Sequence, residues 1–379
     1  MSNWKTYKLG DLVTFQRGHD LTKSQMQEGS FPVAGSNGVI GFHNEYTTKA
    51  PSITIGRSGN IGNAYFFDKD FWAHNTTLYI KEFKNCDPKF IYYLLQTINF
   101  GGHNSGSAVP SLNRNYIHPI EIQAPDLATQ VEIAQILSSL DDKIELLQQM
   151  NQTLENIAQA IFKEWFVDFN FPGFDGELVD GLPKGWNYKV IKDLGKVVTG
   201  NTPASKNPEY FGKVTPFVTP TDFKNFGKLI ISANRFLSNG GKLAMQSRLL
   251  PIHSIVVTCI GSDMGKVAMN SVECITNQQI NSIIPNQENL KDYLYYDLVY
   301  KYDYLRNIAT GGSTMPIINK SRFEEIEVLI PTSDILENFQ LLMNSFNCKI
   351  EENIKQLEAL TQTRDTLLPK LMSGSLEIN

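Results

Sequence analysis

Hydrophobic residues recur at alternating steps of four and three along two long segments of the chain. The first series begins at Ile133 and the second at Phe339. The members of the two series are Ile133, Leu137, Leu140, Ile144, Leu147, Asn151, Leu154, Ala158, Ile161 and Trp165, then Phe339, Met343, Phe346, Ile350, Asn353, Leu357, Leu360, Arg364, Leu367 and Leu371. Ten consecutive positions at a mean step of 3.5 residues are typical of a coiled coil. The pattern predicts long helices over residues 126–167 and 332–372.

Each series contains one asparagine, Asn151 in the first and Asn353 in the second. If the helices pair in opposite directions with Ile133 facing Leu371, then Asn151 faces Asn353. A buried asparagine pair fixes the register of a coiled coil, whereas an unpaired one loses its hydrogen bonds to water. The sequence therefore favours an intramolecular antiparallel coiled coil about 50 Å long. The alternative is two amphipathic helices that pack separately, each on its own domain.

The segments that precede the two helices repeat each other. WKTYKLGDLVTFQRG begins at Trp4 and WNYKVIKDLGKVVTG begins at Trp186, an offset of 182 residues. GSAVPSLNR (residues 106–114) and GSTMPIINK (residues 312–320) align at an offset of 206. The ends of each half therefore match while the middles diverge, which indicates that a unit of domain plus helix is duplicated.

This repeat predicts an α+β protein with two mixed α/β domains, two long helices and an approximate internal two-fold repeat. The expected segments are a first domain over residues 1–125, a first helix over 126–167, a linker over 168–185, a second domain over 186–331, and a second helix with its tail over 332–379. The linker segment is rich in Gly, Pro and Asp, which are typical of connecting loops.

Charge is distributed unevenly along the chain. The 379 residues carry a net charge of −5, which by itself argues against a nucleic-acid partner. Residues 1–125 hold 11 Lys/Arg against 9 Asp/Glu, and residues 185–331 hold 16 against 12. Residues 126–168 hold 2 against 8, and residues 332–372 hold 4 against 6. The helices thus carry the acidity, and the two mildly basic domains are compatible with DNA.

Motifs for catalysis and for membrane insertion are missing from the sequence. It contains no (N/D)PP(Y/F) methyltransferase tetrapeptide, no G-x-x-x-x-G-K-[ST] loop and no PD…(D/E)xK nuclease arrangement. Its four cysteines stand far apart and offer no metal site. No apolar run reaches about 18 residues, and no basic-then-apolar leader opens the chain. We expect a cytoplasmic, non-catalytic protein without cofactor, metal or membrane anchor.

Two other classes of protein remain as alternatives. One is a self-contained DNA methyltransferase or nuclease whose motifs have diverged, which bound S-adenosylmethionine or activity of the isolated chain would reveal. The other is a coiled-coil scaffold with no DNA role, which sequence-dependent DNA binding would exclude.

The order of domain, long helix, linker, domain and long helix resembles the specificity (S) subunit of type I restriction–modification systems. The local matches are PVAGSNGVIGFHNE at Pro32, IQAPDLATQVEIAQILSSLDDKI at Ile122, LPKGW at Leu182 and NTPASKNPEYFGKVTPFVTPTDF at Asn201. The resemblance covers essentially the whole chain. One departure is that the second helix lacks a counterpart of Gln130 near its start.

The resemblance implies a role in DNA methylation and phage defence. Each domain would be a target-recognition domain that reads one half of an asymmetric, bipartite double-stranded DNA sequence. The coiled coil would set the spacing of the half-sites, roughly one DNA turn apart. It would also dock two methyltransferase (M) subunits, and restriction/translocase (R) subunits would join the complex.

Loops rich in glycine, amides and cations are the candidate DNA contacts. Residues 56–60 and 261–266 occupy equivalent places and offer backbone amides with Arg57 or Lys266 to phosphate. Residues 74–77 and 277–279 are also equivalent, and their amides suit adenine recognition. The alternatives are ordinary glycine-rich hairpins and polar strand edges. The predicted DNA-binding residues are Arg57, Ser58, Asn60, His74, Asn75, Thr76, Thr77, His103, Asn104, Ser105, Ser107, Arg114, Thr219, Ser262, Lys266, Asn277, Gln278, Gln279, Ser313, Thr314 and Lys320.

Two further features concern the helices. The duplicated segment at residues 106–114 and 312–320 is predicted to be a joint between domain and helix, shaped by Leu112 and Ile318. Asp141, Asp142 and Glu145 are predicted on the outer face of the first helix, where they would meet a basic partner surface or stay solvated.

Overall fold

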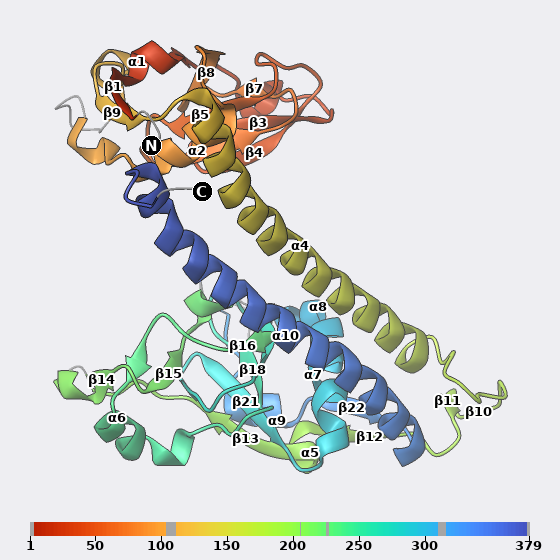
Figure 1. Cartoon of the computed structure of the whole chain (residues 1–379). Coiled ribbons are helices and arrows are strands. Elements are labelled where there is room, and N and C mark those ends of the chain that lie inside the picture. The colour runs from red at the N-terminus through yellow and green to blue at the C-terminus, as the bar shows by residue number, and fades with distance from the viewer. Residues whose placement is uncertain (1–3, 104–110, 205, 225–226, 310–315, 377–379) are drawn as a thin grey trace. The chain divides into compact units, whose positions relative to one another are not determined.

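The chain forms two compact units in the computed structural model (Figure 1). Unit 1 comprises residues 1–146 and 356–379, and unit 2 comprises residues 147–355. The structure describes residues 4–103, 111–204, 206–224, 227–309 and 316–376. Among these residues, no helix is long and apolar enough to cross a membrane.

Two helices of 40 residues each, α4 (Leu127–Phe166) and α10 (Ser333–Met372), run through the fold. Each unit contains one half of both helices. All residues of the two predicted hydrophobic series are buried or half-buried. The two units do not separate the helices from the globular domains. Each half-helix packs on the globular part of its own unit and shares the hydrophobic core of that part.

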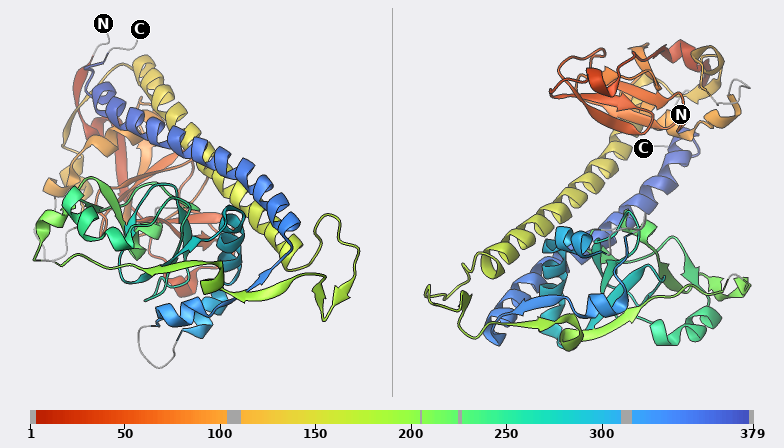
Figure 2. Two further views of the ribbon diagram at one scale, coloured as in Figure 1. Left: turned by 90° about the horizontal axis from the view of Figure 1, so that it is seen from below. Right: turned by 180° about the vertical axis from the view of Figure 1, so that it is seen from behind.

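The helices pair in opposite directions within each unit (Figure 2). In unit 1, Ile133 of α4 shares a core with Leu371 of α10, and Asp141 Oδ1 lies 2.9 Å from Arg364 Nη1. In unit 2, Asn353 Nδ2 donates to Asn151 Oδ1 at 2.7 Å, and the rings of Trp165 and Phe339 lie 6.0 Å apart. Later residues of α4 thus meet earlier residues of α10, which confirms the predicted antiparallel pairing.

The asparagine pair distinguishes α4 from α10. At the repeat offset of 206, the position equivalent to Asn151 is Leu357, and the one equivalent to Asn353 is Leu147. Each asparagine therefore has a leucine at its repeat-equivalent position in the other helix, and the asparagine of that helix lies one step of the series away. An asparagine in this register meets another asparagine only when α4 pairs with α10, since each helix paired with a copy of itself would set asparagine against leucine.

Replacing Asn353 with leucine should lower the free energy of unfolding by about 1–3 kcal/mol, because it removes the hydrogen-bond partner of Asn151 at a largely buried position. The double variant Asn151→Leu/Asn353→Leu should recover most of this loss, since two apolar groups then face each other. Urea denaturation of the four proteins of this cycle measures the effect. A single Asn353→Leu variant more stable than the wild type would contradict the pairing.

The described residues of unit 1 form three sheets and a covering helix. β1 (Lys5–Lys8) pairs antiparallel with β9 (Glu121–Ala124). The four-stranded sheet has the order β2 (Val13–Arg17), β8 (Thr77–Phe83), β5 (Ser52–Gly56) and β6 (Ala64–Phe67). The three-stranded sheet has the order β4 (Gly38–His43), β3 (Phe31–Gly35) and β7 (Trp72–Ala73). The helices are α1 (Leu9–Leu12), α2 (Pro88–Thr97) and α3 (Arg114–Ile117), with 3-10 turns η1 (Lys23–Gln25) and η2 (Phe100–His103).

Unit 2 repeats this plan with additions in its middle. β12 (Asn187–Val190) pairs antiparallel with β22 (Glu327–Ile330). The five-stranded sheet has the order β13 (Gly195–Thr199), β21 (Ile280–Pro285), β18 (Ile255–Thr258), β19 (Val267–Asn270) and β16 (Leu229–Ile230). The four-stranded sheet has the order β14 (Phe211–Gly212), β17 (Phe236–Leu237), β15 (Thr215–Val218) and β20 (Ile275–Thr276).

The remaining elements of unit 2 complete the correspondence. They are α5 (Ile191–Leu194), α6 (Asn239–Ala244), α7 (Lys291–Tyr300), α8 (Tyr302–Ile308) and α9 (Lys320–Glu324), with 3-10 turns η3 (Pro208–Tyr210), η4 (Pro220–Lys224), η5 (Gln246–Arg248) and η6 (Glu288–Leu290). The orders β1-α1-β2 and β12-α5-β13 match, as do β5-β6-β7-β8-α2 and β18-β19-β20-β21-α7. The internal repeat predicted from the sequence is thus confirmed, and the divergent middles hold β4 in one unit and β14, β16, β17 and α6 in the other.

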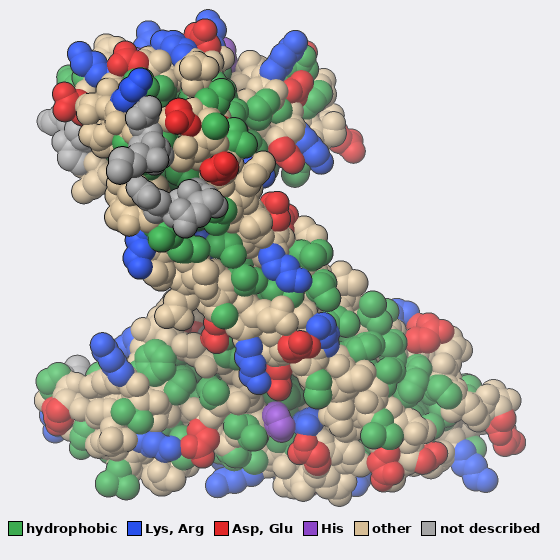
Figure 3. Space-filling view, viewed as in Figure 1, with side chains coloured by type: hydrophobic (Ala, Val, Ile, Leu, Met, Phe, Trp, Pro, Cys, Tyr) green, Lys and Arg blue, Asp and Glu red, His purple; other side chains and the backbone are tan. Residues whose placement is uncertain are grey.

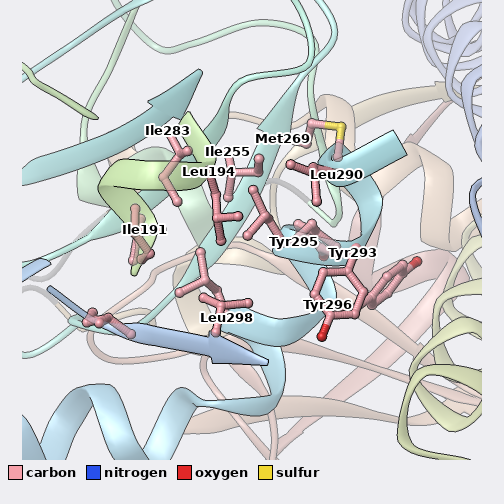
Figure 4. Close-up of a cluster of buried hydrophobic side chains, with 14 of the residues drawn as sticks. Ile191, Leu194, Ile255, Met269, Ile283, Leu290, Tyr293, Tyr295, Tyr296 and Leu298 are labelled. Atoms are coloured by element: carbon pink, nitrogen blue, oxygen red, sulfur yellow. The ribbon is translucent and has the colours of Figure 1, made fainter. Parts of the chain in front are cut away.

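A large aromatic and aliphatic core lies between the five-stranded sheet and the helices of unit 2 (Figure 4). Ile255 and Ile283 of the sheet face α7, whose Tyr293 and Tyr296 are almost fully buried. Phe339 of α10 packs edge-on against Tyr296 at 6.0 Å between ring centroids. Because α10 contributes to this core, the half-helix and the globular part fold as one unit.

The segment predicted as a linker is anchored by aromatic rings. Trp186 is buried, Phe171 stacks on it at 5.1 Å, and Phe166 at the end of α4 lies 5.9 Å from it. A short hairpin of β10 (Leu178–Val179) and β11 (Leu182–Pro183) separates the two ends of this segment. Burial of the rings ties the exit of α4 to the start of the second repeat.

Gln130 explains the one departure noted between the two helix starts. Its Oε1 accepts a hydrogen bond from the Asp87 amide at 3.0 Å, and its Nε2 donates to the Pro125 carbonyl at 2.9 Å. The repeat-equivalent Leu336 is buried in the apolar core of unit 2. A polar brace in one unit is therefore replaced by hydrophobic packing in the other.

Candidate nucleic-acid interface

The turn that joins β7 to β8 in unit 1 is held from both sides by main-chain hydrogen bonds. Gly18, directly after β2, donates its amide to the Thr77 carbonyl at 3.0 Å. His19 donates to the Ala73 carbonyl at 2.7 Å, and His74 donates to the Ala34 carbonyl at 3.0 Å. The turn is thus fastened to the ends of both β2 and β3.

The turn that joins β20 to β21 in unit 2 has the same set of bonds. Gly200 donates to the Ile280 carbonyl at 3.1 Å, and Asn201 donates to the Thr276 carbonyl at 2.9 Å. Asn277 donates to the Val218 carbonyl at 3.0 Å. Residues 74–77 and 277–280 therefore occupy equivalent positions on a shared backbone framework.

This framework requires glycine at the end of its first strand. A Cβ atom added to Gly18 would lie 2.1 Å from the His74 carbonyl oxygen, and one added to Gly200 would lie 2.2 Å from the Asn277 carbonyl oxygen. No side chain fits at such distances, so the main chains approach closely only because both residues are glycine. These two glycines also align in the repeat of the sequence.

The glycine-rich loops and the duplicated joint close the framework. Arg57 donates its amide to the Thr76 carbonyl and accepts from the Leu112 amide, both at 2.8 Å. In unit 2, Cys259 donates to the Gln279 carbonyl at 2.8 Å and accepts from the Ile318 amide at 2.9 Å. The described part of the joint is therefore tied by a main-chain hydrogen bond to the glycine-rich loop of its unit.

The joint also begins a short helix in each unit. The Asn113 side chain accepts from the Asn115 amide at the start of α3, and the Asn319 side chain accepts from the Arg322 amide at the start of α9. Leu112 is buried, and so is its repeat equivalent Ile318.

Of the predicted contact residues, Asn104, Ser105, Ser107, Ser313 and Thr314 lie outside the described residues. His103 is the last residue of η2.

The predicted cations do not occupy equivalent positions, although their loops do. Arg57 aligns with the buried Cys259 on the shared framework, and its guanidinium donates to the Asn75 carbonyl at 3.3 Å. Lys266 forms an ion pair with Asp263 at 2.7 Å. Arg114 and Lys320 are exposed at the repeat-equivalent starts of α3 and α9, and Lys320 lies 3.4 Å from Glu324.

Three predicted contact side chains are instead used to build the turns. Thr77 is fully buried and donates its hydroxyl to the His74 carbonyl at 2.8 Å. Both ring nitrogens of His74 have partners, Thr76 Oγ1 at 2.9 Å and the Leu21 carbonyl at 3.0 Å. Asn277 is buried and donates to Gln279 Oε1 at 2.9 Å. Since buried polar groups must keep their partners, these side chains stabilise the turns rather than present free groups.

The other predicted residues differ in how far they reach solvent. Thr219 donates its hydroxyl to Asp222 Oδ2 at 2.7 Å, which stabilises the start of η4. Asn60 and Ser262 are exposed in the glycine loops, and Ser58 forms a β-bridge with Ser111. Among the residues of the two turns, Asn75 is half-buried and Gln278 is exposed.

Two residues that sequence reasoning missed form hydrogen bonds with side chains of the two turns. Asp20 Oδ1 accepts a hydrogen bond from Asn75 Nδ2, and Thr202 donates its hydroxyl to Gln278 Oε1 at 2.7 Å. Both stand two residues after the framework glycines, Gly18 and Gly200. That shared spacing is the signal by which the sequence could have revealed them.

Asp141 on α4 is not a free surface carboxylate. It accepts from the Tyr93 hydroxyl at 2.7 Å and pairs with Arg364 of α10 within unit 1. Burial, together with the hydrogen bond to Asp141, raises the pKa of Tyr93 well above its usual value. Asp141 thus takes part in an internal brace of unit 1, while Asp142 and Glu145 are exposed.

The surface carries charges of both signs. On the face shown in Figure 3, Lys and Arg side chains are interspersed with Asp and Glu side chains. Within the described residues, no group of three or more His, Cys, Asp or Glu side chains is placed to hold a metal ion. Burial raises the pKa of the Cys86 thiol to about 11 and those of Cys259 and Cys274 to about 12, which keeps these thiols protonated at neutral pH.

Comparison with known proteins gives consistent matches. The chain matches the family model "Type I restriction modification DNA specificity domain" over residues 1–156 and 183–362. It is 32% identical over 357 residues to the type I restriction enzyme HindI specificity subunit of Haemophilus influenzae, covering 76% of this chain and 77% of that protein. It is 30% identical over 316 residues to the MjaIX specificity subunit of Methanocaldococcus jannaschii, covering 78% and 72%.

A solved structure supports the fold independently. The S subunit of a type I restriction–modification system from M. genitalium matches with a TM-score of 0.66 at 17% identity, covering 100% of this chain and 97% of that one. At this identity the match speaks for the fold alone, and the sequence matches establish the family. The chain therefore belongs to the family of type I restriction modification DNA specificity proteins, the specificity (S) subunits.

Proposed function

We propose that the chain is the non-catalytic DNA-recognition subunit of a cytoplasmic type I restriction–modification complex. Each unit reads one half of a bipartite double-stranded DNA target through the framework at the end of its sheet. The observation that carries this proposal is that the same set of main-chain hydrogen bonds occurs twice, around Gly18 and around Gly200.

The proposed target is asymmetric, because the two frameworks carry different side chains. Asn75 in unit 1 corresponds to Gln278 in unit 2, and Arg57 corresponds to Cys259. The elements that differ between the repeats are β4 in unit 1 and β14, β16, β17 and α6 in unit 2, and along the chain they lie between the framework glycine and the glycine-rich loop of each unit. Base edges are distinguished by the donors, acceptors and apolar groups placed against them, so different side chains select different half-sites.

The partners are methyltransferase and restriction subunits. We propose that two M subunits dock against the helical parts of the chain and that R subunits join for cleavage. The catalytic chemistry then resides in these subunits and S-adenosylmethionine binds to M, so the chain itself needs no cofactor. An exposed acidic side chain on α4, Asp142, is available for such docking.

Selection from a random double-stranded DNA library by the complex of this chain with its M subunit tests the proposal. The enriched sequences should contain two short, different blocks separated by a gap of fixed length. Affinity for the selected DNA should fall steeply with salt, because phosphate contacts release counterions. The chain without M should show no methyltransferase or nuclease activity on the same DNA. Activity of the isolated chain would favour the alternative of a self-contained enzyme, and absence of any enriched sequence would refute the DNA-reading role.

A further inference from the structure

We propose that Asn75 and Gln278 are the base-reading side chains of the two turns, and that Asp20 and Thr202 are positioning residues that orient them. This inference rests on the proposed DNA-reading function and assigns its specificity to one residue pair in each unit. Asp20 and Thr202 each lie two residues after the framework glycine of their unit. Asn75 and Gln278 are each the second residue of their turn, so both pairs occupy the same place on the shared framework.

In unit 1, Asn75 is held through both its main chain and its side chain. Its carbonyl accepts from Arg57 Nη1 at 3.3 Å, and its Nδ2 donates to Asp20 Oδ1. Asp20 also accepts from Arg17 Nη2 at 3.2 Å, so a cation lies beside its exposed carboxylate. An ionised carboxylate only accepts hydrogen bonds, so Asp20 turns the amide nitrogen toward itself and sets the orientation of the amide.

In unit 2, Gln278 is the residue of its turn that reaches furthest into solvent. Its neighbours Asn277 and Gln279 are joined to each other by a side-chain hydrogen bond of 2.9 Å. The exposed Gln278 side chain is fixed at its oxygen by the Thr202 hydroxyl at 2.7 Å. The arrangement of unit 1 is thus reproduced with a different amide and a different partner.

Each pair leaves the amide able to bind a base edge. Within the described part of the chain, Asn75 keeps its Oδ1 and one N–H, while Gln278 keeps both N–H groups and one lone pair of its Oε1. One donor and one acceptor are what adenine N6 and N7 require in the major groove. An amide already fixed in one orientation loses less conformational entropy on binding, and it also rejects bases that would need the opposite orientation.

Library selection with variant complexes tests the assignment. Asn75→Ala should relax the preference at a base pair of one half-site by roughly ten- to a hundredfold and leave the other half-site unchanged. Gln278→Ala should relax the other half-site and leave the first unchanged. The matched control is Asn44→Ala, because Asn44 also donates its Nδ2 to a neighbouring exposed side chain, Gln27 Oε1 at 2.9 Å, but lies outside the framework. This control should leave both half-sites intact.

The positioning residues are tested by conservative and disruptive replacements. Thr202→Ser keeps the hydroxyl donor and should select the wild-type motif. Thr202→Val keeps the shape but lacks the hydroxyl, and it should weaken the base preference at the same position as Gln278→Ala. Asp20→Ala should relax the base pair read by Asn75, and Asp20→Asn should have an intermediate effect because its amide accepts without fixing the orientation. A merely structural role would lower stability without moving specificity at one base pair, so thermal unfolding of each variant is measured alongside.

The outcomes separate this inference from the proposed function. If the wild-type complex enriches no split sequence, the proposed function fails. If the wild type enriches one while Asn75→Ala and Gln278→Ala preserve it in full, the proposed function stands and this inference fails. A uniform loss of affinity across all sequences also overturns the inference, because it identifies phosphate contacts rather than base reading.

Discussion

Replacing Asp292 with alanine is expected to lower the free energy of unfolding of unit 2 by about 3–5 kcal/mol, since it leaves a buried lysine without its counter-charge. Asp292 Oδ1 lies 2.5 Å from Lys228 Nζ, and the two side chains are 0% and 1% exposed. Asp292 also accepts from Gln340 Nε2 at 2.6 Å and from Asn347 Nδ2 at 2.9 Å. Gln340 and Asn347 of α10 and Lys228, next to β16, thus all contact the Asp292 carboxylate of α7.

The control for this experiment is Lys228→Met/Asp292→Leu, which removes both charges at once. Because no charge is then left buried alone, this variant should lose less stability than Asp292→Ala. The amides of Gln340 and Asn347 still lose a partner, so some loss remains. Urea denaturation followed by tryptophan fluorescence compares the three proteins. An Asp292→Ala variant as stable as the wild type would show that the pair does not stabilise unit 2.

The pH dependence of stability follows from the same carboxylate. Burial acts to raise the pKa of Asp292, but the charge of Lys228 and the hydrogen bonds from Asn347, Lys228 and Gln340 outweigh it and lower the pKa below 3.8. A lowered pKa in the folded state contributes stability that is complete above the unfolded value. This contribution is therefore present at neutral pH and is lost as the pH falls from about 3.8 through the folded pKa.

The second large effect is expected at the framework glycines. Gly18→Ala and Gly200→Ala each force a Cβ to within 2.1 or 2.2 Å of a carbonyl oxygen, so the strand end and the turn must separate. We expect a loss of about 1–3 kcal/mol or more from overpacking. Because each variant displaces the turn that we propose reads DNA in its unit, each should also abolish selection for one half-site while sparing the other.

Thermal unfolding and library selection on the same variants measure both parts of this expectation. Gly240→Ala in α6 is the matched control in unit 2, since an added Cβ there would meet only Ser238 Oγ at 3.7 Å. It should leave stability and both half-sites unchanged. A Gly200→Ala variant that enriches the same DNA sequences as the wild type would contradict the role assigned to the framework.

The helices and the repeat could be predicted from the sequence because neither prediction requires knowing which distant residues are in contact. A step of 3.5 residues requires no knowledge of distant contacts, and alignment of the halves at Gly18 and Gly200 needs only self-comparison. The Lys228–Asp292 pair escaped prediction because its members are 64 positions apart, and a charged residue in isolation resembles an exposed one. The strands of the middle segments could not be inferred either, because the repeat offers no counterpart there.

The sequence predicted both the loops of the candidate interface and individual contact side chains, but it could not tell which of these side chains are internal. Equivalence of the turns at residues 74–77 and 277–279 followed from the repeat. Which side chains of a turn are buried depends on the strands beside it, and this is why His74, Thr77 and Asn277 became internal partners. Asp20 and Thr202 were missed because their contact with the turn arises only when the end of the first strand folds against it.

The most direct test of the central claim, that each unit reads one half of an asymmetric split target, is to map methylated DNA in cells. The chain is co-expressed with its M subunit in cells that lack other adenine methylation, and N6-methyladenine is located by long-read sequencing. The account predicts a split, asymmetric motif with one methylated adenine in each half. A symmetric and contiguous motif, or no methylation by an assembled complex, would contradict it.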